Sequence, residues 1–153
     1  MEFTEDFRRG VEDYRLFLER GYPEGTLKKV VGDRHRLSRE ERLILFRGVS
    51  TEAADRRRRG KRCDPAVIDG SRLLIDFYNV AFVVLNYRLG RPVFLGTDSF
   101  VRDAGALHGR LGREERLDAV VPAILDSVAR LKPREAIFFL DAPVSHSGAH
   151  AKR

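Results

Sequence analysis

The sequence predicts an α/β protein in which a parallel sheet, flanked by helices in three layers, follows a small all-α N-terminal module. Two observations support this prediction. In the second half of the chain, continuous apolar segments of strand length alternate with segments of helical length, which is typical of parallel strands covered on both faces. In the first half, apolar residues recur at three- and four-residue steps between helix-capping signals. We therefore expect a helical module at 1–55, a basic linker at 56–64 and an α/β domain at 65–153 that is truncated at its C-terminal end.

Composition narrows the class of protein further. The 153 residues are 42% hydrophobic and 34% charged, which is a globular composition. A single cysteine, Cys63, excludes an intramolecular disulfide and a cysteine-based zinc site. The formal net charge of +6 favours a polyanionic partner, nucleic acid first. Because no apolar segment approaches the roughly 20 residues of a membrane span and the acidic N-terminus lacks a signal-peptide pattern, we expect a cytoplasmic protein without a membrane partner.

Three helices are expected in the N-terminal module. Thr4 is placed to cap a first helix, which carries an apolar stripe and continues to about residue 20. A second, shorter helix is expected at 23–31. Ser38 and Glu41 have the spacing of a capping box and predict the start of a third helix.

A run of cations follows this module. Its members are Arg56, Arg57, Arg58, Arg59, Lys61 and Arg62. Because like charges at this density repel one another and resist packing, we expect a linker or the exposed end of a helix. Two interpretations stay open, an electrostatic clamp for the phosphates of a substrate and a solvated basic connector.

The second half of the chain alternates strands and helices. The expected elements are a strand within 71–77, a helix at 79–88, a strand at 92–95, a helix at 114–131 and a strand at 136–140. Asp76 and Asp141 end two of these strands, and Asp98 lies three residues beyond the end of a third.

Acids at strand ends point to a metal site. In an open parallel sheet the carboxyl ends of the strands meet at one edge, where ligands bind. Carboxylates that converge there need a cation between them, and their hard oxygen atoms suit Mg²⁺ or Mn²⁺. The alternative is that each aspartate only caps the helix or turn that follows it.

At this point the sequence resembles known families. Residues 73–80 read Leu-Leu-Ile-Asp-Phe-Tyr-Asn-Val and resemble the first strand of PIN-like nucleases of the NYN group, in which an apolar strand leads into Asp-Gly-x-Asn and a helix. The chain as a whole is similar to domain-of-unknown-function family 434, which joins a short helical module to a PIN-like domain. The segments that carry this similarity are 21–23, 31–34, 37–42, 47–49, 90–95, 100–103 and 140–145.

The resemblance implies a metal-dependent nuclease that hydrolyses phosphodiester bonds in RNA, or in single-stranded nucleic acid more generally. Asp76 and Asp141 would bind Mg²⁺ or Mn²⁺ as catalytic acids, with Asp98 or Asp103 as the middle acid. The cations of the arginine run would attract the substrate backbone.

Two polar residues complete the implied site. Asn79 would orient Asp76 or a substrate phosphate, and Ser145 would hydrogen-bond a phosphate or Asp141. Phe77 stands where the NYN pattern has glycine, so we expect it to narrow or reshape the site.

Two other functions stay open. In one, the PIN-like fold binds nucleic acid without cleaving it. In the other, the helical half of the chain contacts a protein partner. Whether the protein forms a homodimer is also left open.

Overall fold

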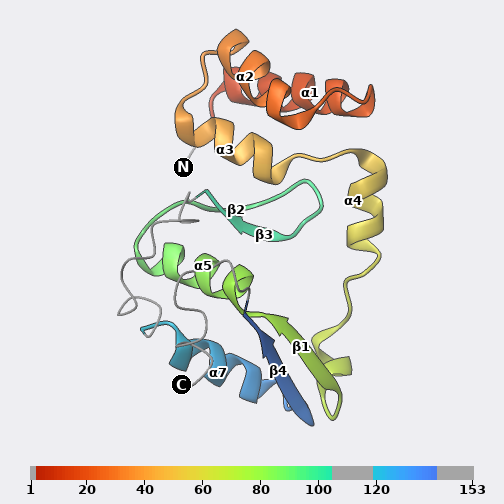
Figure 1. Ribbon diagram of the computed structural model, residues 1–153, viewed down its shortest axis with the longest axis vertical. Helices are drawn as coiled ribbons and strands as arrows, with labels where there is room; N and C mark the ends of the chain where they lie inside the picture. Colours follow the sequence, from red (N-terminus) through yellow and green to blue (C-terminus); the bar gives the residue numbers. More distant parts are fainter. Residues whose placement is uncertain (1–2, 105–118, 141–153) are drawn as a thin grey trace. The chain divides into compact units, whose positions relative to one another are not determined.

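Two N-terminal helices begin at their predicted capping residues, Thr4 and Ser38, in the computed structural model, which describes residues 3–104 and 119–140 (Figure 1). The helices of this part are α1 (Glu5–Glu19), α2 (Glu24–Arg34), α3 (Arg39–Gly48) and α4 (Glu52–Arg59), of which α4 is not among the three predicted. The Thr4 hydroxyl accepts a hydrogen bond from the Phe7 N–H at 3.1 Å. At the start of α3, the Ser38 N–H donates to the Glu41 carboxylate at 2.8 Å and the Glu41 N–H donates to the Ser38 hydroxyl at 3.2 Å, which confirms the capping box.

The arginine run begins within a helix and not in an irregular linker. The Thr51 hydroxyl accepts a hydrogen bond from the Ala54 N–H at 3.2 Å and so caps α4. Glu52 and Asp55 lie in the first turn of α4, and Arg56–Arg59 form its last turn. This order places anions and cations at the ends of the helix where the macrodipole favours each of them. Of the two expectations for this run, the exposed end of a helix therefore holds for its first residues, and a linker can begin only after Arg59.

The described residues divide into two compact units, each of which has its own core. Unit 1 contains residues 3–62 and 91–104, and unit 2 contains residues 63–90 and 119–140. The segment 91–104, which we expected in the second domain, therefore belongs with the N-terminal helices. It forms a hairpin of two antiparallel strands, β2 (Val93–Leu95) and β3 (Val101–Asp103).

The hairpin corrects the prediction that the strand at 92–95 joins the parallel sheet. Residues 96–100 alone connect β2 to β3, whereas parallel strands need a crossover of about a dozen residues or more. The Gly96 N–H donates to the Phe100 carbonyl at 2.9 Å and closes this loop. Glycine is required at this position because a Cβ atom would collide with the Arg102 guanidinium.

The core of unit 1 is built from the helices α1, α2 and α3 and from residues that flank the helices and the hairpin. Its buried members are Phe7, Tyr14 and Leu18 of α1, Leu27 and Val31 of α2, Ile44 and Leu45 of α3, and Leu37, Val49 and Ala104 outside the helices. The partly buried Phe94 of β2 packs against them. Burial, together with the charge of Glu24, raises the pKa of Tyr14 to about 12. Its hydroxyl therefore stays protonated at neutral pH and donates to the Glu24 carbonyl at 3.4 Å, which ties α1 to the start of α2.

Unit 2 contains the parallel pair of strands that the sequence predicts. Its described elements are a 3₁₀ helix (Pro65–Ile68), β1 (Arg72–Asp76), α5 (Phe77–Arg88), α7 (Val121–Arg130) and β4 (Glu135–Phe139). Strands β1 and β4 are hydrogen-bonded neighbours, with Leu74 opposite Ile137 and Asp76 opposite Phe139. Apolar side chains of α5 form a cluster with Val120 and Ile124, and Phe138 of β4 packs against it.

The described strands form two two-stranded sheets in a mixed α/β protein, and a larger three-layer sheet remains a prediction. The helices that the structure describes include none that is both long and apolar enough to cross a membrane.

The side chain of Arg42, in the first half of α3, reaches back to α2 and lies over Gly32 of that helix. Its guanidinium donates to the Leu37 carbonyl at 2.9 Å, to the Asp33 carboxylate at 2.6 Å and to the Lys29 carbonyl at 3.4 Å. These bonds connect Arg42 of α3 to the Leu37 carbonyl in the loop after α2 and to two groups of α2 itself. The guanidinium lies directly over Gly32, where an added Cβ atom would come within 2.5 Å of its Nη1.

Gly32→Ala should therefore lower the free energy of unfolding by about 1–2 kcal/mol. Displacing the guanidinium weakens charged hydrogen bonds worth about 1.5–3 kcal/mol each, and the better helix propensity of alanine offsets about 1 kcal/mol. Urea denaturation followed by circular dichroism measures the change. Gly25→Ala in the same helix is the control, because no atom lies within 4 Å of its added methyl group, and we expect it to be neutral or stabilising.

A double-mutant cycle identifies the cause. In an Arg42→Ala background, Gly32→Ala should become stabilising, since the clash is gone and the propensity gain remains. An equal loss of stability in both backgrounds would show that Arg42 is not the reason for the glycine.

Candidate functional site

Asp76 lies at the predicted edge of the parallel strand pair. It is the last residue of β1 and caps α5, and its carboxylate is exposed. One carboxylate oxygen accepts a hydrogen bond from the Asn79 N–H at 3.3 Å, and the other accepts one from the Asn79 side-chain amide at 2.6 Å. Both interpretations of Asp76 are compatible with this geometry, since a capping carboxylate also has lone pairs left to accept further ligands.

Phe77 does not cover this edge. It begins α5, its side chain is 8% exposed, and its ring packs at a centroid distance of 5.4 Å from Tyr78 and 6.2 Å from Phe138. The backbone of Phe77 does not have the positive φ that would require glycine. Among the described residues the ring fills the core of unit 2 and does not narrow this edge, and its effect on the shape of the complete site stays a prediction.

Asp141 and Ser145 lie outside the described residues. Leu140 is the last described residue before them and follows β4 directly. Because β1 and β4 run in the same direction, the chain leaves both strands at the same edge. Asp76 and Asp141 can converge only if their two strands are parallel, and β1 and β4 meet this condition.

The described residues provide only part of a metal site. The Asp76 carboxylate is a hard oxygen donor of the kind that Mg²⁺ and Mn²⁺ prefer. Within 3–104 and 119–140, however, no three His, Cys, Asp or Glu side chains are grouped closely enough to hold a metal ion. A complete site therefore needs donors in addition to Asp76.

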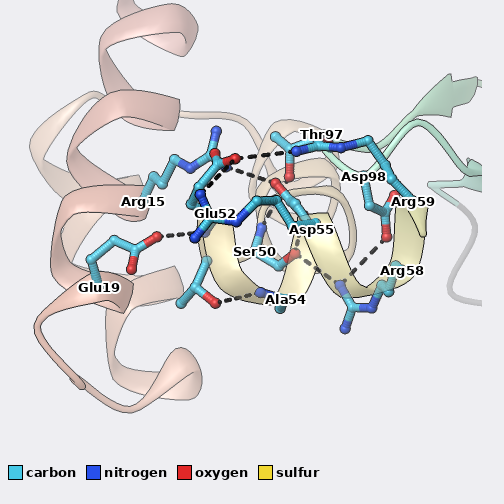
Figure 2. A network of polar contacts seen from close by, with 12 residues as sticks. Arg15, Glu19, Ser50, Glu52, Ala54, Asp55, Arg58, Arg59, Thr97 and Asp98 are labelled. Carbon is cyan, nitrogen blue, oxygen red and sulfur yellow. Dashed lines mark hydrogen bonds and ion pairs between the residues drawn. The ribbon is translucent and has the colours of Figure 1, made fainter. Parts of the chain in front are cut away.

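Asp98 has a structural role in unit 1. Its side chain is 1% exposed and lies in the loop between β2 and β3. Arg102 binds both carboxylate oxygens at 2.6 Å, Arg58 lies at 3.4 Å, and the Phe100 N–H donates at 3.1 Å (Figure 2 shows Arg58 facing Asp98). The hydrogen bonds from Arg102 hold the pKa of Asp98 below its usual value, although burial opposes them.

Asp103 is paired in a similar way. Its buried carboxylate accepts hydrogen bonds from Arg47 of α3 at 3.2 and 3.5 Å. Asp98 and Asp103 thus belong to the hairpin of unit 1, whereas Asp76 belongs to unit 2. Because arginines of unit 1 already bind both carboxylates, the metal site proposed below is restricted to Asp76 and Asp141.

The arginine run contributes to a polar network that the sequence did not reveal (Figure 2). Asp55 is fully buried and accepts hydrogen bonds from the Arg15 guanidinium, at 2.7 Å, and from the Ser50 hydroxyl. Arg58 donates to the Ser50 hydroxyl at 2.8 Å, and Arg59 donates to the Thr97 carbonyl at 2.8 Å. The sequence does contain a signal for the helix that carries this network. Thr51 is followed by acidic and then basic residues, and this order of charges indicates a capped helix with an acidic first turn.

Because Asp98 is ion-paired, we expect that neutralising its side chain lowers the free energy of unfolding. Asp98→Asn leaves Arg102 and Arg58 facing an uncharged amide. Breaking a buried ion pair by removing one partner costs about 3–5 kcal/mol, and both arginines are partly exposed, so we expect the free energy of unfolding to fall by about 2–4 kcal/mol at pH 7. Glu5→Gln, which breaks an exposed pair with Arg9, is the control and should change stability by less than about 0.5 kcal/mol.

The pH dependence of this loss tests its electrostatic origin. The pKa of Asp98 is lower in the folded than in the unfolded protein, so its charge stabilises the fold at pH values above the unfolded value of about 4. As the pH falls through the folded value, the carboxylate is protonated and that contribution is lost. The stability difference between the parent and Asp98→Asn should therefore be constant from about pH 5.5 to 8 and shrink below about pH 4. A difference that persists undiminished at pH 3 would exclude the ion pairs as its cause.

Comparison with known proteins divides the chain near the boundary predicted from the sequence. The model of a family described as Protein of unknown function (DUF434) matches residues 6–61, so the similarity to family 434 holds for the N-terminal part alone. A second model, described as Domain of unknown function (DUF5616), matches residues 65–153, and neither description names a nuclease.

A protein of Methanocaldococcus jannaschii, described as Uncharacterized protein MJ0935, is 26% identical over 142 residues, which cover 93% of this chain and 68% of that protein. No solved structure matches the chain. Since the second family model spans more than half of the sequence, the chain belongs to the DUF5616 family and carries a DUF434 segment before that domain.

Proposed function

We propose that the edge at which β1 and β4 end is a divalent-metal site that hydrolyses phosphodiester bonds in RNA or other single-stranded nucleic acid. The observation that carries this proposal is the parallel pairing of the two strands, with the exposed Asp76 at the end of β1. Asp141 follows the other strand in the sequence and is the second proposed ligand.

The described half of the site is organised before any metal binds. The side-chain amide of Asn79 holds one oxygen of Asp76 at 2.6 Å, and its N–H holds the other at 3.3 Å. A carboxylate fixed in this way loses little side-chain freedom when it binds a cation, and each oxygen keeps a lone pair for it. Asn79 is therefore proposed as a positioning residue for Asp76, and Ser145 as a donor to a substrate phosphate.

The proposed cation is Mg²⁺ or Mn²⁺, held by Asp76 and Asp141. When bound, it would activate water and neutralise negative charge on the phosphoryl group. The net charge of +6 supports a polyanionic substrate.

A second candidate function is binding of nucleic acid without cleavage. It is favoured by the pairing of Asp98 and Asp103 with arginines in unit 1, which already neutralises two of the acids that the sequence offered as metal ligands.

Neutralising either proposed ligand tests the site. Asp76→Asn and Asp141→Asn should each reduce Mn²⁺-dependent cleavage of a labelled single-stranded RNA at least about tenfold, since even the loss of a residue that only orients a ligand costs 10–100-fold. Asparagine caps helices as well as aspartate does, so Asp76→Asn should keep α5 intact. Mn²⁺ affinity, measured by calorimetry, should fall together with cleavage.

Asp126→Asn is the matched control, because Asp126 is an exposed carboxylate on α7 whose partner is Arg130. It should cleave and bind Mn²⁺ as the parent does. Cleavage that survives in both Asp76→Asn and Asp141→Asn, or that continues in EDTA, would contradict the metal site. RNA binding by a parent protein that cleaves nothing would favour the second candidate.

A further inference from the structure

The cations around the end of α4 separate into two groups. Arg58 and Arg59 point into unit 1, where they bind Asp98, the Ser50 hydroxyl and the Thr97 carbonyl. The remaining cations are all exposed, and we call them the outer basic surface. They are Arg56, Arg57, Lys61 and Arg62.

The presence of Arg58 and Arg59 is explained by the structural groups that they bind within unit 1. Asp98 is buried and needs positive partners, and the Thr97 carbonyl needs a donor. The sequence-based prediction that the whole run binds a substrate therefore has to be divided, because Arg58 and Arg59 already have partners within unit 1.

The outer basic surface has no comparable structural explanation. The side chains of Arg57, Lys61 and Arg62 form no ion pair or hydrogen bond with any described residue, and Arg56 lies 3.9 Å from Glu52 while 69% exposed. The helix macrodipole favours cations only within the last turn, and Lys61 and Arg62 lie beyond it. Like charges at neighbouring positions repel one another and reduce stability.

The backbone holds these cations together in space. The Lys61 N–H donates to the Arg58 carbonyl and the Arg62 N–H donates to the Arg59 carbonyl, both at 3.0 Å, so the chain keeps turning after α4 ends. Four exposed cations therefore lie within the seven residues 56–62, a high local density of positive charge, and arginine guanidinium groups match phosphate oxygens in a bidentate manner.

The composition of α4 distinguishes between two polyanions. A helix that lies on an anionic membrane needs a face of large apolar residues to enter the boundary with the acyl chains. Helix α4 reads Glu-Ala-Ala-Asp-Arg-Arg-Arg-Arg and has no such residue. The phosphate backbone of a nucleic acid needs only the charges.

We infer that the outer basic surface of unit 1 binds the phosphate backbone of single-stranded nucleic acid. The inference rests on the proposed function for the class of substrate, but it assigns binding to unit 1 and does not require the Asp76 site to be active. Binding and hydrolysis can therefore be tested separately.

The test measures RNA affinity as a function of salt. The full-length Asp76→Asn protein is titrated in EDTA against a fluorescein-labelled oligouridine, so that cleavage cannot interfere. The triple variant Arg57→Gln, Lys61→Gln and Arg62→Gln is compared with a control of equal charge change, Arg8→Gln, Arg20→Gln and Lys29→Gln, at exposed positions of the same unit.

Three lost phosphate contacts should reduce the slope of log K against log salt by about 2 and weaken binding about 100-fold at 0.1 M salt. The control variant should keep the slope of the parent. Neither variant should lower the temperature of thermal unfolding, since the exposed charges replaced have no partner among the described residues.

Equal weakening by both triple variants would overturn the inference, because it would show a response to net charge alone. Failure of the parent to bind oligouridine would also overturn it. The same proteins are sedimented with phosphatidylserine vesicles, and binding to vesicles in place of RNA would contradict the choice of partner. A protein that binds RNA through this surface and cleaves nothing would support the inference while rejecting the proposed hydrolysis.

Discussion

Unit 1 depends on the neutralisation of buried carboxylates. Asp55, Asp98 and Asp103 are at most 2% exposed, and moving a carboxylate out of water costs several kcal/mol unless a partner compensates it. The partners are arginines from α1, α3, α4 and β3, so the ion pairs can form only when the helices and the hairpin have taken their places within the unit. Electrostatics here acts as a constraint on packing.

Local interactions made much of the fold predictable. The capping residues Thr4 and Ser38 determine helix starts through bonds that span only three residues, and such signals can be recognised in a sequence. The partner of a strand cannot be recognised in this way. The segment 92–95 has the composition of a strand, but its antiparallel pairing follows from the tight loop after it and from contacts with helices distant in the sequence. For the same reason the sequence could not show that Asp98, three residues beyond the expected strand, is an ion-pair partner of Arg102 and Arg58 in a loop.

The candidate site was predictable where a strand end determines it and not where tertiary contacts do. Asp76 and Asn79 follow β1 directly, and the parallel register with β4 is consistent with the expected edge. The division of the arginine run into inward and outward cations depends on which of them meet Asp98 and Thr97, residues about 40 positions further along the chain. No local pattern encodes that pairing. The direction of the Phe77 ring, into the core of unit 2, is likewise a result of packing against β4.

The hairpin has a consequence for how the protein is made. Unit 1 is discontinuous, since residues 63–90 of unit 2 separate its helices from β2 and β3. During synthesis on the ribosome, Arg47 and Arg58 emerge well before the carboxylates that neutralise them, and the core has to wait for Phe94 and Ala104. Contacts of such sequence separation slow folding, because a long loop has to close before they form. The N-terminal helices therefore cannot complete the core of unit 1 until the chain has been synthesised as far as Ala104, after the whole 63–90 segment of unit 2.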